Sequence, residues 1–162
     1  MPRITILLSL VCIMTVGGCI AVARRGLGTI IGPSGKMELI EDHGGISPGE
    51  RVAKVVIMDE DSGYFEEGKA AILQSAIESE LNEAKLLGGP KANLVLSMEF
   101  TKYIDRPAKK VLKLNGILSR DGITVGTAKM TSDLTGYASD EEMAEAIGKA
   151  SVEFVQRLSE AD

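Results

Sequence analysis

Few side chains in this 162-residue chain have the types needed for chemistry, because it holds one histidine and two cysteines. That is too few for a zinc cage, a disulfide scaffold or a histidine-based triad.

His43 lies in a glycine-rich segment with no rigid element to aim it, so we expect it at the surface. The acidic run Asp59-Glu60-Asp61 could bind calcium or magnesium, but it lacks EF-hand spacing, and a solvated approach to a helix accounts for the same residues. We predict no catalytic residue, metal or cofactor; the alternative is a hydrolase site near Asp59–Asp61.

Cys19 has the most specific chemical context. Met1–Arg3 gives a short positive start, Ile4–Val16 is an uncharged apolar run, and Gly17 and Gly18 stand immediately before the cysteine. This order is typical of a secretory signal peptide and its cleavage site. A thiol is a good soft nucleophile, and glycines let an extended backbone enter a protease cleft.

The junction Val16–Cys19, which reads VGGC, resembles the lipobox of bacterial lipoproteins, with glycine where alanine or serine is more usual. The resemblance implies that Cys19 carries diacylglycerol, that residues 1–18 are removed as a signal peptide, and that the new amine is acylated, for example with palmitate. Two or three acyl chains give nearly permanent membrane attachment, at about 0.8 kcal/mol per buried methylene. In these lipoproteins Asp after the cysteine favours the inner membrane; Ile20 stands there, which implies the periplasmic face of the outer membrane.

Two other interpretations of the N-terminus stay open. The uncharged stretch Ile4–Ala23 has 20 residues, enough to span a bilayer as an uncleaved helix that ends at Arg24 and Arg25. Alternatively, an ordinary signal peptide is cleaved and Cys19 keeps a free thiol, which is a liability in an oxidising compartment.

Five positive side chains gather within a dozen residues of a protein whose net charge is -5. They are Lys102, Arg106, Lys109, Lys110 and Lys113. They could contact an anionic membrane surface, the phosphates of a glycolipid or an acidic envelope protein, at roughly 1 kcal/mol per cation. The alternative is a solvated loop beside an edge strand that lysines protect. The acidic balance gives no reason to expect nucleic acid as a partner, and the oligomeric state stays open.

The elements that position these groups begin after a glycine-rich stretch. Between Gly26 and Gly49 there are seven glycines, with Pro33 and Pro48 nearby, and no sustained helix or strand period. We therefore interpret residues 19–50 as a lipidated cysteine followed by a tether. Within it, residues 36–41 (KMELIE) partly alternate and fit a short edge strand.

A single folded domain is predicted over residues 51–162. Its first strand is the β-branched apolar run at 52–58 (VAKVVIM), whose pattern is typical of a strand covered on more than one side. Residues 64–87 carry apolar side chains three or four positions apart, which predicts an amphipathic helix that Gly88-Gly89-Pro90 ends.

Three strands and a second helix complete the domain. The strands are predicted at residues 93–103, 109–119 and 123–131. Asp121-Gly122 provides a tight turn between the last two strands. Ser139 to Glu142 form a capping box, and the apolar stripe from Met143 to Leu158 predicts the helix that follows.

The order strand, helix, three strands, helix predicts an α+β fold. It is a two-layer sandwich with a small mixed or antiparallel sheet and both helices on one face, because each helix must bury an apolar stripe. The other face of the sheet is expected to be partly polar, and either solvated or a docking surface. Its residues are expected to include Ser97, Glu99, Thr101, Lys113 and Asn115.

The region from Asn93 through the last helix resembles a group of bacterial lipoproteins built on a domain of unknown function. The likeness includes residues 98–103 (MEFTKY), the loop Arg106-Pro107-Ala108 and the turn at Asp121-Gly122. It implies an envelope location and a compact α+β domain, and it transfers no catalytic or ligand residue. The sequence thus predicts a membrane-anchored, non-enzymatic module, which either binds an envelope protein or an anionic glycolipid or is a structural protein of the envelope with no dedicated ligand.

Overall fold

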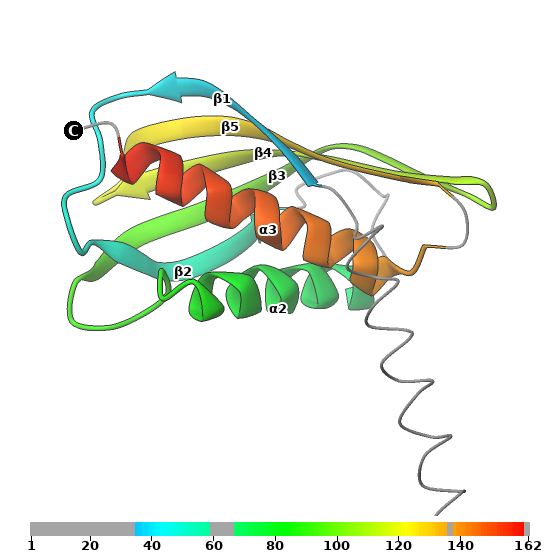
Figure 1. The fold of residues 1–162 in the computed structure, drawn as a ribbon, viewed down its shortest axis with the longest axis horizontal. Coiled ribbons are helices and arrows are strands. Elements are labelled where there is room, and N and C mark those ends of the chain that lie inside the picture. The colour runs from blue at the N-terminus through cyan, green and yellow to red at the C-terminus, as the bar shows by residue number, and fades with distance from the viewer. Residues whose placement is uncertain (1–34, 59–66, 136–137, 161–162) are drawn as a thin grey trace, which may run out of the picture. The chain divides into compact units, whose positions relative to one another are not determined.

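A computed structural model describes residues 35–58, 67–135 and 138–160. All of them belong to Pro33–Asp162, one of two compact units into which the chain divides. Five strands and two helices form within these ranges (Figure 1). They are β1 Gly35–Asp42, β2 Arg51–Met58, α2 Glu67–Glu83, β3 Ala92–Arg106, β4 Lys109–Arg120, β5 Ile123–Thr135 and α3 Asp140–Ser159. Neither of these helices is long and apolar enough to cross a membrane.

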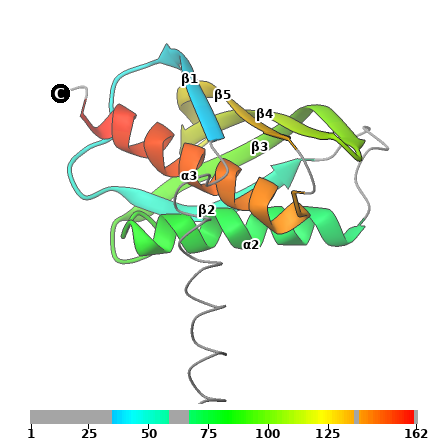
Figure 2. The same ribbon diagram turned by 45° about the vertical axis from the view of Figure 1, so that its right-hand side comes forward.

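The five strands form one mixed sheet in the order β1-β5-β4-β3-β2. Strands β2 and β3 are parallel neighbours, with α2 between them in the chain, and the other neighbouring strands are antiparallel. Both helices cover the same face of the sheet, and the opposite face is left open (Figures 1 and 2). The predicted two-layer α+β sandwich is confirmed.

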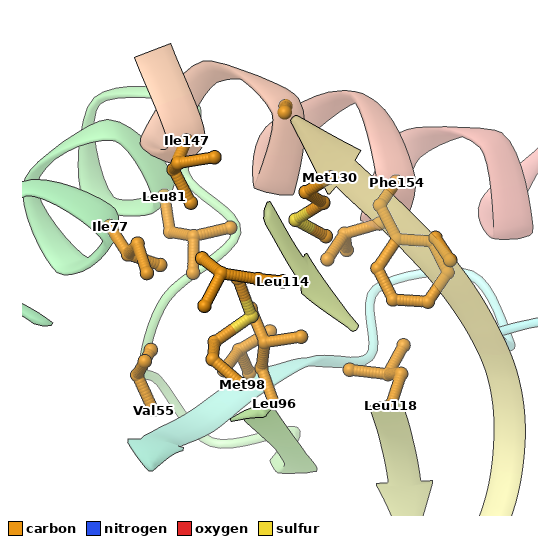
Figure 3. Close-up of a cluster of buried hydrophobic side chains, with 14 of the residues drawn as sticks. Val55, Ile77, Leu81, Leu96, Met98, Leu114, Leu118, Met130, Ile147 and Phe154 are labelled. Carbon is orange, nitrogen blue, oxygen red and sulfur yellow. The ribbon is translucent and has the colours of Figure 1, made fainter. Parts of the chain in front are cut away.

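The core lies between the sheet and the two helices. Figure 3 shows Ile77 and Leu81 of α2 facing the same cluster as Ile147 and Phe154 of α3. The side chains of the sheet that face these helices include Val55, Leu96, Met98, Leu114, Leu118 and Met130, all nearly inaccessible to solvent. The alternation predicted for β3 and β4 and the stripe predicted for α3 therefore point into the core as expected.

The capping box and the hairpin turn predicted from the sequence are both present in the structure. The Ser139 hydroxyl accepts a hydrogen bond from Glu142 N at 3.1 Å, and the Glu142 carboxylate accepts one from Ser139 N at 2.9 Å, which completes the capping box of α3. Asp121 and Gly122 have φ angles of 51° and 79° between β4 and β5. Both positive angles are those of a two-residue hairpin turn.

Helix α2 ends earlier than the periodicity predicts, at Glu83 instead of Leu87. Lys85 takes a positive φ of 59°, and Leu86 N donates to Leu81 O at 2.8 Å, which is the hydrogen-bond pattern of a Schellman motif. Leu86 O then accepts from Val52 N at 2.8 Å. Leu86 and Leu87, which follow the helix, pack against the core of the domain. Their apolar side chains continue the helical period, so the sequence pattern predicts one more helical turn.

The predicted boundary between tether and domain, at residues 50 and 51, is wrong. Residues 35–42 form a full edge strand paired with β5, longer than the strand expected at 36–41. After it, Ile46 is 2% exposed within the core, and its N–H donates to Leu158 O at 3.1 Å. Two of the glycines that suggested a tether, Gly44 and Gly45, instead lie in a turn, where their φ angles are 110° and 61°.

Candidate functional site

The open face of the sheet carries two rows of polar side chains across β3, β4, β5 and β1. They point away from the helices because they alternate with inward-facing residues such as Leu114 and Met130. Directly paired residues share a face, so the pairing defines each row. The first row, in strand order, is Lys102, Lys113, Thr131 and Lys36. The second row, beside it along the strands, is Glu99, Asn115, Lys129 and Glu38.

These rows border an open hollow of about 690 Å³ on the face opposite the helices. Its polar lining combines three lysines and one glutamate with hydroxyl and amide groups. They are Lys36, Glu38, Thr101, Lys113, Asn115, Lys129 and Thr131. Three of the five residues predicted for the open face therefore line the hollow, while Ser97 and Glu99 lie on the same face outside it. We call this surface, with Lys102 at its border, the open-face groove.

The lysines of the open-face groove are not paired with carboxylates of the described residues. Within the part of the chain that the structure describes, no salt bridge engages Lys36, Lys102, Lys113 or Lys129. Their ammonium groups are hydrogen-bond donors without acceptor capacity, and the threonine hydroxyls and the asparagine amide beside them can both donate and accept. The groove is equipped to bind an anion that also carries hydroxyl groups.

The five basic residues predicted as one cluster are divided by the fold. Lys102 and Lys113 face the groove, whereas Lys110 points to the helix side, where its Nζ lies 2.9 Å from Asp140 Oδ1. Lys109 pairs with Asp133 at 3.4 Å, and Arg106 lies exposed at the end of β3. Strand alternation turns Lys110 to the helix side, while the pairing of β3 with β4 keeps the other four basic residues on the open face.

The helix-side lysine belongs to an ionic cluster at the start of α2 and α3. Lys69 Nζ donates to the Tyr103 hydroxyl at 3.0 Å and lies 3.5 Å from Asp140, and the Tyr103 hydroxyl donates to Asp105 at 3.1 Å. The hydrogen bond to Tyr103 and the two aspartate charges raise the pKa of Lys69. Partial burial is the main cause that raises the pKa of the Tyr103 hydroxyl. The cluster joins the β3–β4 hairpin to both helices.

The residues considered for catalysis or metal binding do not assemble into a site in the described part of the chain. His43 is exposed, as expected, with its Nε2 3.2 Å from a Glu41 carboxylate oxygen. The acidic run Asp59–Asp61 lies outside the described residues, as does Cys19. Among the residues that are described, no three histidine, cysteine, aspartate or glutamate side chains are grouped to hold a metal ion.

Two groove lysines, Lys36 and Lys129, were missed by the sequence reasoning. A signal for each was present, because Lys36 alternates with the inward-facing Met37, and Lys129 alternates with Met130. What could not be found from alternation alone is that β1 pairs with β5, with Lys36 opposite Thr131. That pairing joins residues far apart in the chain.

Comparison with known proteins places the fold among solved structures. No protein-family model matches the chain, and no curated protein matches it in sequence. Among solved structures, the dodecamer of PelC from Paraburkholderia phytofirmans superposes with a TM-score of 0.53 at 18% identity, over 73% of this chain and 96% of PelC. A variant PelC dodecamer in another crystal form gives 0.53 at 16% identity, with the same coverage.

A more distant likeness links the chain to a Xanthomonas campestris protein of the family of unknown function DUF330. The TM-score is 0.41 at 10% identity, over 74% of this chain and 89% of that protein. At the identities found for PelC, the likeness establishes a shared fold and nothing finer. The chain is thus an α+β domain with one helix-covered and one open sheet face, and PelC has the same fold.

Proposed function

We propose that this protein is a lipid-anchored, non-catalytic module of a bacterial cell envelope, which binds an envelope component through the open-face groove. The observation that carries the proposal is the hollow of about 690 Å³, whose three lysines make no salt bridge with any described residue. Its lining holds hydrogen-bonding groups, cations and one carboxylate, Glu38, and the carboxylate of Glu99 beside it accepts a hydrogen bond from Asn115 at 3.4 Å. Such a surface suits binding.

The anchor in this proposal is Cys19, modified as the lipobox resemblance implies. Residues 20–34 separate it from the first strand. A chain of that length spans at most about 50 Å when fully extended. We place the domain on the periplasmic face of the outer membrane, where this reach lets the groove meet soluble or membrane-bound components.

We further propose that copies of the protein assemble with one another. The support is the fold shared with PelC, which crystallises as a dodecamer. Assembly would place several grooves on one particle, and several weak sites bind a polymer far more tightly than one. Light scattering of the detergent-extracted protein tests this directly, and a monomer mass over all usable concentrations contradicts it.

Two experiments test the proposal. The intact mass of membrane-extracted protein should match a diacylated or triacylated chain that begins at Cys19, and Cys19→Ala should leave an unprocessed chain. A photo-crosslinking residue in place of Asn115 should capture an envelope component in living cells. The matched control is the same residue in place of Gln156, which is exposed on α3. Equal capture at both positions, or at neither, contradicts binding through the groove.

A further inference from the structure

The open-face groove presents its cations in a line that runs across the strands. Lys102, Lys113 and Lys36 occupy one row, with Thr131 between the last two. Neighbouring strands lie about 4.8 Å apart, so the row extends over about 14 Å. The second row runs alongside at about 7 Å, two residues further along each strand. Cations distributed over this length do not converge on one point, as the donors around a small anion do.

The charge of the groove is opposite to that of the protein. Its lining holds three lysines and one glutamate, whereas the whole chain has a net charge of -5. Elsewhere on the hairpin the basic side chains Lys109 and Lys110 are paired with aspartates. The groove therefore holds positive charge that no described carboxylate pairs with, and a polyanion is the ligand that it complements.

Two features of the groove distinguish between polyanions. The site is a hollow lined by exposed lysines, and a narrow polymer chain can lie within it and contact more of its lining than a flat membrane surface can. It also crosses β4 and β5, which are interior strands whose backbone groups are already paired within the sheet. Peptides that bind to sheets gain affinity by pairing with backbone at an edge strand, whereas β4 and β5 offer them side chains alone.

We propose, resting on the proposed function, that the groove binds a carboxylated polysaccharide, one chain of which lies across β3, β4, β5 and β1. The lysines pair with carboxylates of successive acidic sugars. Thr101, Asn115 and Thr131 exchange hydrogen bonds with the sugar hydroxyls, which need partners that both donate and accept. Each contact is exposed and weak, so affinity comes from their number and falls as salt is raised.

The test uses the full-length lipidated protein in detergent, with oligogalacturonate as the probe. Its fully methyl-esterified form is the matched neutral probe, because it keeps the sugar backbone and removes the charge. The double variant K36Q/K113Q should weaken oligogalacturonate binding about five-fold or more, since each exposed ion pair contributes a modest amount. The variant K149Q, which removes one charge from a paired lysine on α3, should change binding little. The variant E38Q should strengthen it.

Each possible result of these binding measurements either supports or contradicts the proposed polysaccharide ligand. Salt-sensitive binding of the acidic probe that depends on Lys36 and Lys113 supports the proposal. Equal binding of the esterified probe, stronger binding of polyglutamate, or lysine-dependent binding to anionic vesicles each overturns it. Absence of binding to any polyanion also overturns it. If crosslinking at Asn115 still captures a component in cells in that last case, the proposed function survives and the ligand class alone is wrong.

Discussion

Lys110 Nζ lies 2.9 Å from Asp140 Oδ1, and this contact ties the start of β4 to the first residue of α3. Both side chains are mostly buried, with exposures of 17% and 25%. Burial by itself raises the pKa of Asp140, but the hydrogen bond from Lys110 and the charges of Lys110 and Lys69 outweigh it and hold the pKa below its ordinary value of 3.8. The hydrogen bond with Asp140 also raises the pKa of Lys110.

The first prediction follows from the depressed pKa of Asp140. A carboxylate of this kind stabilises the fold above its unfolded-state pKa, and that stability is lost as the pH falls through the lower folded-state pKa. Lys110→Met, which keeps the aliphatic stem, should lower the free energy of unfolding by about 1 kcal/mol at pH 7. At a pH below the folded-state pKa of Asp140, where the carboxyl is protonated, the difference between variant and wild type should shrink towards zero. Urea denaturation at both pH values measures it.

A matched variant controls for the loss of a lysine. Lys109→Met breaks a pair with Asp133 in which both side chains are about half exposed. Solvent screens such a pair, so its effect at pH 7 should be smaller than that of Lys110→Met. A cost for Lys110→Met that is the same at both pH values would show that packing of the lysine stem, and not the ion pair, is responsible.

Much of this fold could be predicted because its strongest signals are local. The capping box at Ser139 and the Asp121-Gly122 turn each depend on residues within three positions of one another. The buried stripe of α3 repeats with the helical period, so Phe154 and Leu158 could be assigned to the core from the sequence. Both helix placement and most strand faces follow from these patterns.

The parts that were missed depend on contacts between distant segments. Lys36 lies opposite Thr131, and Arg120 forms a salt bridge with Glu50 that holds the segment before β2 against β4. Burial opposes ionisation of Glu50, but hydrogen bonds from Asn93, Ser47 N and Arg120 lower its pKa. Glycine content alone could not distinguish a tether from this tightly bound loop. Consequently the polar face was predicted with its β3 and β4 residues but without those of β5 and β1.

The second prediction tests the corrected domain boundary. Ile46 is 2% exposed, whereas Ile40 in the edge strand is 48% exposed. Ile46→Ala should therefore lower the free energy of unfolding by about 2–4 kcal/mol, as expected for a buried isoleucine. Ile40→Ala should change it by less than about 0.5 kcal/mol. Chemical denaturation of both variants gives the comparison, and a negligible cost at Ile46 would return residues 43–50 to the tether.

The third prediction concerns the close approach of β1 to α3. A Cβ on Gly35 would lie 1.9 Å from the Ala146 carbonyl oxygen, which belongs to the backbone of α3 and cannot swing aside. Gly35→Ala should thus displace the strand and destabilise the protein by about 1–3 kcal/mol.

The control is Gly68, in the first turn of α2, where an added methyl group would meet no described atom within 4 Å. Gly68→Ala should instead stabilise by about 0.5 kcal/mol, because alanine loses less backbone entropy on folding. Thermal unfolding of the two variants should shift Tm in opposite directions, and equal shifts would contradict this account of Gly35.

The fourth prediction compares two serines in different environments. Ser132 is fully buried, and within the described structure its Oγ has no hydrogen-bond partner. Ser132→Ala removes an unsatisfied hydroxyl, so it should leave the free energy of unfolding unchanged or raise it by up to about 1 kcal/mol. Ser139 caps α3, where its hydroxyl accepts from Glu142 N at 3.1 Å, so Ser139→Ala should cost about 1 kcal/mol. Urea denaturation of the two variants should thus show that the same chemical change stabilises or is neutral at one site and destabilises at the other. Destabilisation by Ser132→Ala comparable to that of Ser139→Ala would mean that the Ser132 hydroxyl is satisfied after all, and would point to a buried water beside β5.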